Sequence, residues 1–176
     1  MTVAASPRAK LASSALQAFA VAGGAIVFLL AIAGLANAWL AHAPLPDAFR
    51  KVAVIAHVAT VLLALPLGVS QILLPKGTFR HRTVGYIWVG LMIATALVSF
   101  AIHQINPHGL SATHILSAMT LVFAPLIVIF ARRGQVAKHV AVVLGPMLGG
   151  LVVAGLLTFI PGRALGQLVF RLFGHG

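Results

Sequence analysis

The sequence predicts an all-α protein: a polytopic membrane bundle of five transmembrane helices, followed by a short C-terminal amphipathic helix at the membrane surface. Of the 176 residues, 61% are hydrophobic and only 7% are charged, whereas a soluble domain has roughly a quarter charged residues. The apolar residues also gather in five stretches of about 20 residues, the length that spans the hydrocarbon core of a bilayer. We therefore expect the lipid bilayer to be the main partner of the chain.

The five expected spans follow one another with short gaps. They cover residues 17–41, 51–74, 83–103, 111–131 and 138–160. Proline, glycine and asparagine, which are turn residues, occupy the gaps. None of the gaps can hold a second domain. The chain is therefore expected to divide into an N-terminal tail (1–16), one transmembrane domain (17–160) and a C-terminal segment (161–176).

The first apolar stretch has a second interpretation. A basic start, an apolar run and the small residues around His42 are also features of a secretory signal peptide. The apolar part of such a peptide has about 7–15 residues, and this run is longer. We therefore expect a retained first span.

The basic residues predict the orientation of the bundle. The chain has 12 lysines and arginines and a single acid, Asp47. Alternate gaps lie on the same side of the membrane, and the larger basic set falls on the side of the N-terminus: Arg8, Lys10, Lys76, Arg80, Arg82, Arg132, Arg133 and Lys138. This bias predicts a cytoplasmic N-terminus and a C-terminus on the outer side of the membrane. Because these residues flank apolar runs, we expect no nucleic-acid partner.

The segment after the fifth span has the pattern of an amphipathic helix. Arg163, Gln167 and Arg171 recur every four residues, and mainly apolar residues occupy the positions between them. This periodicity predicts a short helix that lies on the outer membrane surface. The alternative is that the segment is only the frayed end of the fifth span.

Histidine is the residue type with the widest chemical range in this chain. The absence of cysteine excludes iron–sulfur clusters, thiolate zinc sites, thiol catalysis and covalently attached haem. With a single acid there is no pair of carboxylates for acid–base catalysis. Eight histidines remain, and neutral imidazoles are axial ligands of haem b, which needs no cysteine.

The expected topology sorts four histidines into two pairs. His57 lies about two turns inside the second span, roughly 10 Å from its end, at a depth where an imidazole needs a partner. His57 and His114 fall in the outer halves of their spans, whereas His81 and His139 fall at the inner ends of theirs. This alternation predicts two haem b sites with bis-histidine ligation. The candidate partners of the haem propionates are Arg50, Lys51, Arg82 and Arg132.

Other roles for the histidines stay open. His103 is an alternative to His114 as the partner of His57, and His57 could instead only hydrogen-bond a neighbouring helix. His81 and His139 lie in basic stretches, where solvated anchors are common. A soft or borderline metal ion could also be held at the outer surface by four of the eight: His42, His103, His108 and His114.

Six short stretches carry a family resemblance. They are QILLPKGTFRHRTVGYIWV (71–89), LM (91–92), SFAIH (99–103), SATHILS (111–117), ARRGQVAKH (131–139) and AGLLTFIPGR (154–163). With these motifs the chain resembles, over about residues 57–170, the bacterial membrane family called domain of unknown function 2306. The resemblance implies a polytopic protein of the bacterial inner membrane, whose outer side is the periplasm, and it supplies no activity. Its recurring motifs include His57, His81, Arg82, His114, His139 and Arg163.

One position departs from this family pattern, and a second similarity concerns only layout. After His139, Val140 and Ala141 stand where the family has a basic pair. The alternating placement of the histidines is similar to that of two-haem transmembrane cytochromes b, although the motifs are not shared.

Two functions follow from these observations. The first is a b-type cytochrome that transfers electrons across the membrane together with a redox partner. The alternative is a non-catalytic accessory subunit of a larger membrane complex, in which the histidines only form hydrogen bonds. A transporter is disfavoured because neither internal repeats nor an intramembrane acid is found. No residue is assigned a catalytic role.

Overall fold

The computed structural model describes residues 7–102 and 112–172, and these residues form helices with no strand among them. In chain order the elements are α1 (Pro7–Leu40), η1 (Asp47–Arg50), α2 (Val52–Leu73), α3 (Phe79–Ser99), α4 (Ala112–Arg132), α5 (Val136–Gly145), η2 (Pro146–Val153), α6 (Ala154–Leu157) and α7 (Ala164–Leu172). Together they provide five helices that are long and apolar enough to cross a membrane. The all-α fold with five spans is confirmed for the described residues.

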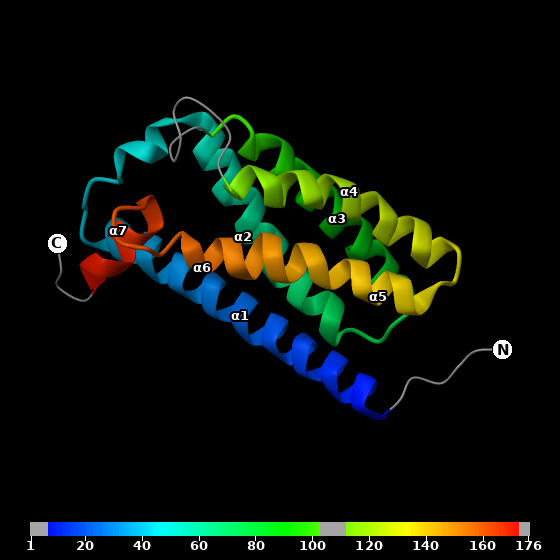
Figure 1. The fold of residues 1–176 in the computed structure, drawn as a ribbon. Coiled ribbons are helices and arrows are strands. Elements are labelled where there is room, and N and C mark those ends of the chain that lie inside the picture. The colour runs from blue at the N-terminus through cyan, green and yellow to red at the C-terminus, as the bar shows by residue number, and fades with distance from the viewer. Residues whose placement is uncertain (1–6, 103–111, 173–176) are drawn as a thin grey trace.

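Helices that follow one another in the chain pack side by side. α2 contacts α3, α3 contacts α4, and α4 contacts α5, while α1 closes the bundle against α2 and η2. α1 begins at one end of the bundle and α7 lies at the other end (Figure 1). Large apolar side chains such as Leu29, Val52 and Ile115 stay exposed on the outside. Lipid tails are the solvent for such a surface, and the chain is a multi-pass membrane protein.

Two helices begin earlier than the apolar stretches predicted. α1 begins at Pro7 and not at residue 17, so the predicted tail is partly helical. α3 begins at Phe79 and not at residue 83, because the Thr78 hydroxyl caps it by accepting a hydrogen bond of 3.1 Å from the His81 backbone N–H. This cap satisfies one of the free N–H groups of the first turn. The basic stretch that resembled a loop is therefore helical, and His81 lies in that first turn.

The fifth span is one continuous rod (Figure 1), and its helical winding changes in the middle. It is α-helical in α5, π-helical from Pro146 to Val153 in η2, and α-helical again in α6. A proline inside a helix has no N–H to donate and its ring crowds the preceding turn. The π-helical segment begins at this proline, and its wider turn relieves that crowding.

Small residues let α1 and the fifth span approach each other closely. A Cβ atom on Gly155 would lie 2.7 Å from Val27 Cγ1, and one on Gly23 would lie 2.6 Å from Val152 Cγ1. Each valine therefore packs against the bare backbone of the facing helix. In lipid, where apolar side chains gain nothing by leaving the solvent, this close packing is a main source of helix association.

The predicted amphipathic helix after the fifth span is present as α7, but its apolar face is covered by protein. Leu165, Leu168 and Val169 are buried, and α7 packs against α1 and η1. Arg171 on the polar face donates a hydrogen bond of 2.9 Å from Nη1 to the Pro44 carbonyl. The periodicity thus predicted the helix correctly. Its apolar face packs against protein, and its place at the membrane surface stays a prediction.

Candidate functional site

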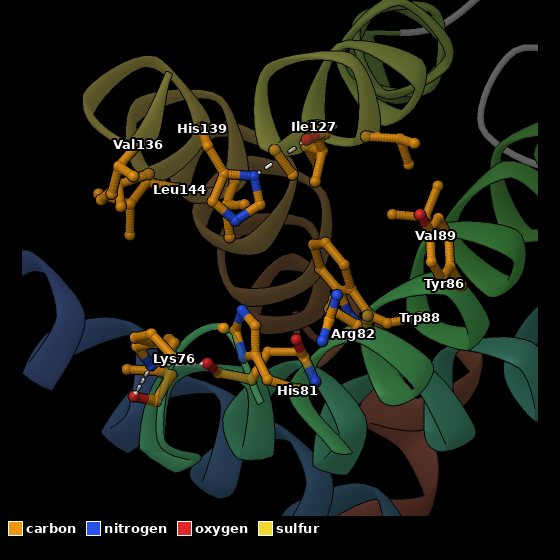
Figure 2. Close-up of a pocket in the computed structure, with 18 of the residues that line it drawn as sticks. Lys76, His81, Arg82, Tyr86, Trp88, Val89, Ile127, Val136, His139 and Leu144 are labelled. Carbon is orange, nitrogen blue, oxygen red and sulfur yellow. Dashed lines mark hydrogen bonds between the residues drawn. The ribbon is translucent and has the colours of Figure 1, made fainter. Parts of the chain in front are cut away.

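The first candidate site is a cavity of about 480 Å³ at the end of the bundle where α1 begins. We call it the His81–His139 cavity, because these two histidines line it. Figure 2 shows the two rings projecting into it from opposite sides, His139 from α5 and His81 from α3. The volume of the cavity falls within the range of about 300–1,000 Å³ that is typical of small-molecule sites.

The proton position on His139 is fixed by a neighbouring helix. Nδ1 lies 3.0 Å from the carbonyl oxygen of Ile127 on α4, as the dashed line in Figure 2 marks. A carbonyl oxygen can only accept, so Nδ1 carries the proton and Nε2 keeps its lone pair. Metal-binding histidines are commonly held in this way, with the second ring nitrogen bonded to a carbonyl or carboxylate.

His81 is held by the side-chain amide of Gln71, a buried residue on α2. The orientation that satisfies the amide directs its nitrogen to the His81 carbonyl oxygen (3.0 Å) and to His81 Nδ1 (3.2 Å), while its oxygen accepts from the Gly85 N–H (3.3 Å). This orientation follows from the hydrogen-bond network. Nδ1 of His81 is then an acceptor, so the proton of the neutral ring lies on Nε2.

Three cationic side chains line the same cavity: Lys76, Arg82 and Arg132. Lys76 Nζ donates to the carbonyl oxygens of Gln71 (2.8 Å) and Ile72 at the C-terminal end of α2. Partial burial lowers the pKa of Lys76, because the charged form loses water. Arg132 lies over the Tyr86 ring and donates to its hydroxyl at 3.3 Å.

The cavity has positive charge and no carboxylate to balance it. The single acid of the chain, Asp47, belongs to η1 and forms an ion pair of 3.1 Å with Arg50. It does not line the His81–His139 cavity. The carboxylates of a bound molecule would therefore meet cations without displacing an existing ion pair.

This donor set can be tested for its fit to haem b. His139 fits, because its free lone pair lies on the nitrogen that is not bonded to the protein. His81 fits only after its proton moves to Nδ1 and the Gln71 amide turns to accept it. Lys76, Arg82 and Arg132 fit the two propionates, and Arg82 and Arg132 are two of the four partners predicted from the sequence.

A second cavity, of about 510 Å³, lies between α1, α2, α3, α4, η2 and the start of α7. We call it the His57 cavity. His57 Nδ1 lies 3.2 Å from the Thr95 carbonyl oxygen on α3, so this ring also carries its proton on Nδ1. His57 is thus hydrogen-bonded to a neighbouring helix, as one of the alternatives expected.

The structure does not bring His57 and His114 to one cavity. His114 on α4 is 3% exposed and its ring centroid lies 5.6 Å from that of Phe100, but it is not among the residues lining the His57 cavity. Arg50 and Lys51 line neither cavity. The haem predicted for this pair stays a prediction without a shared cavity to support it.

Of the remaining histidines the structure describes only His42, which lines neither cavity. His42 is an exposed residue with a positive φ of 48° just after α1. His103 and His108 lie outside the described residues. The two alternatives that use them, His103 as the partner of His57 and a metal ion at the outer surface, therefore stay predictions. Within 7–102 and 112–172, no group of three histidines or acids is arranged to hold a metal ion.

Two polar residues of these sites were missed in the sequence. Gln71 is a lone amide at the end of an apolar run, and Thr95 lies in the middle of one. Both are buried. The signal that could have found them is that an uncharged polar side chain within an apolar span needs a hydrogen-bond partner.

Comparisons of the chain with family models, with curated proteins and with solved structures found no match. The resemblance to domain of unknown function 2306 and the similarity in layout to two-haem cytochromes b therefore stay predictions.

Proposed function

We propose that this chain is a b-type haem protein of the bacterial inner membrane that transfers electrons. The observation that carries the proposal is the pair of histidine rings projecting from opposite sides of the His81–His139 cavity. In the orientation expected from the basic residues, with a cytoplasmic N-terminus and a periplasmic C-terminus, this cavity lies toward the cytoplasm. A redox partner would then deliver or receive the electron.

His139 is the ligand that can bind iron in the tautomer it already has. The Ile127 carbonyl keeps the proton on Nδ1 at 3.0 Å, so Nε2 can donate its lone pair to iron without a prior proton shift. Bound haem would supply one-electron redox chemistry, with a potential set by its axial ligands and their hydrogen bonds.

His81 is the second ligand, and Gln71 is the residue that controls it. When the amide turns, Gln71 Oε1 accepts from Nδ1–H of His81 and Nε2 is free to bind. Lys76, Arg82 and Arg132, which line the cavity, would bind the two propionates of the group.

Absorption spectroscopy tests this function. The full chain is purified in mild detergent from cells with ample haem, and a reduced-minus-oxidised spectrum is recorded. We expect b-type bands in the natural chain and in His42→Asn, a control that replaces an exposed histidine with a residue that tolerates positive φ. We expect the bands to be lost in His139→Ala.

The absence of bands in the natural chain, or bands that persist in both His139→Ala and His81→Ala, would contradict the proposal. The first of these results would favour the accessory-subunit alternative. That role in turn requires a larger complex of fixed stoichiometry after gentle extraction of the membrane.

A further inference from the structure

The His57 cavity contains a buried hydroxyl that has no partner. Thr95 is 8% exposed and lines this cavity, and its Oγ1 forms no hydrogen bond among the described residues. Threonine in a helix usually satisfies its hydroxyl by donating to a carbonyl three or four residues earlier. Thr60 on α2 does so, at 3.0 Å from the Ala56 carbonyl oxygen.

The other hydroxyls that line this cavity within the described residues are already bonded. Ser99 and Ser117 bond each other and each also bonds a carbonyl of its own helix. Thr120 and Thr158 donate to carbonyls of their own segments at 2.9 Å and 2.6 Å, and Thr113 also has a partner. Thr95 is therefore the one whose hydrogen-bonding capacity is left for a ligand.

An unused acceptor lies beside this hydroxyl. His57 Nδ1–H donates to the backbone carbonyl of Thr95 itself, which places the imidazole next to this residue. The remaining ring nitrogen, Nε2, has a lone pair, and His57 forms no other side-chain hydrogen bond within the described part of the chain. A ligand that offers a hydroxyl to Nε2 and an oxygen to the Thr95 hydroxyl would satisfy both.

The rest of the cavity favours an apolar ring as the body of that ligand. Apolar side chains from α2, α3, η2 and η1 line it, among them Phe49, Leu65, Met92 and Leu151. Arg163 and Asp47 also line it, and the Asp47 carboxylate is paired with Arg50. A phenolic hydroxyl is more acidic than that of an aliphatic alcohol, so it is the stronger donor to His57 Nε2. The positive charge of Arg163 stabilises the negative charge that the phenolic oxygen gains when it donates.

We infer that the His57 cavity is a second ligand site, built for a hydroxyl-bearing aromatic ring, a phenol or quinol, which donates to His57 Nε2 and accepts from Thr95 Oγ1. The inference goes beyond haem binding and does not rest on it. The two sites share no histidine, and only the His57 cavity contains this unpaired hydroxyl.

Equilibrium dialysis of the full chain in detergent micelles tests the inference. The probe is trimethylhydroquinone, kept reduced with dithionite, and its dimethyl ether is the matched probe without hydroxyl donors. Thr95→Val removes the hydroxyl at nearly constant volume. Thr60→Val is its control, because that hydroxyl lies outside the cavity and bonds its own helix.

We expect the quinol to bind the natural chain and Thr60→Val alike, and its ether to bind at least roughly tenfold more weakly, as expected for the loss of a hydrogen bond in a buried site. Thr95→Val and His57→Leu should each lower the affinity for the quinol by about tenfold.

Equal binding of quinol and ether, or equal binding by Thr95→Val and Thr60→Val, would overturn the inference. Loss of binding in His139→Ala would also overturn it, since the probe would then occupy the other cavity. Haem content is measured separately for each variant, so that a failure of this inference can be distinguished from a failure of the haem proposal.

Discussion

The two cavities use histidine in different ways, although each contains a ring whose Nδ1 is fixed by a carbonyl of a neighbouring helix. In the His81–His139 cavity, two imidazoles project from opposite sides and three cations stand near them. In the His57 cavity, a single imidazole lies beside an unpaired hydroxyl. Opposed nitrogen ligands suit a metal-centred group with acidic side chains, whereas an adjacent acceptor and hydroxyl suit a small hydroxylated ring. The two cavities therefore differ mainly in the number and kind of polar groups around their histidines.

The largest expected effect separates the cavities by their histidines. His139→Ala should lower the haem content per chain by roughly tenfold or more, since losing even a supporting residue of a metal ligand costs about 10–100-fold. His57→Ala should leave the content unchanged. The haem extracted from equal amounts of purified variants gives the answer. A partial loss of haem in His57→Ala would contradict this difference between the two cavities and would support the predicted haem between His57 and His114.

The next effect concerns the core between the cavities. A Cβ atom on Gly68 would lie 2.7 Å from Trp88 Nε1 and 2.8 Å from Met147 Sδ, so Gly68→Ala should lower the free energy of unfolding by about 1–3 kcal/mol. Gly90→Ala is the control, because nothing lies within 4 Å of its added Cβ. Unfolding in mixed micelles measures both variants. Equal stabilities would show that Trp88 and Met147 can move aside.

A third effect tests how Gln71 sets the proton on His81. In haem-free protein we expect His81 to carry its proton on Nε2, and His57 and His139 to carry theirs on Nδ1. The ¹⁵N chemical shifts of the ring nitrogens report these tautomers. Gln71→Leu should release His81 from this preference and cost about 1 kcal/mol of stability, the usual net value of a hydrogen bond. The same tautomer in all three rings would contradict the difference between His81 and the others.

The smallest effect is a pH dependence caused by Lys76, which lines the His81–His139 cavity. Burial lowers the pKa of Lys76 in the folded protein below its ordinary value of 10.5. Between those two values the unfolded chain binds more protons than the folded one, so the free energy of unfolding should rise with pH in that interval. Lys76→Gln should have a flatter profile there. An unchanged slope would mean that Lys76 keeps its water when the protein folds.

The sequence predicted the spans well and the sites only in part, for physical reasons. The thickness of a bilayer dictates the length of each apolar run, so five helices could be counted before the fold was known. The start of α3 was missed because a Thr78 hydroxyl caps it. His57 and His114 were paired as haem ligands because the two lie at similar depth, but depth alone does not determine which way a side chain points around its helix. Gln71 became visible only when α2 and α3 were placed side by side.

The π-helical winding of the fifth span has a consequence for how the two cavities can change. Each residue of an α-helix turns the chain by about 100°, so the wider turns of Pro146–Val153 shift the phase of everything that follows them. His139 and Leu144, before the shift, line one cavity, and Leu151 and Gly155, within and after it, line the other. One helix thus contributes side chains to both cavities, and the π-helical segment sets the angle between the two sets. Deleting a single residue from that segment would rotate the side chains that line the His57 cavity and leave those of the His81–His139 cavity in place. Such a deletion would alter one site without the other.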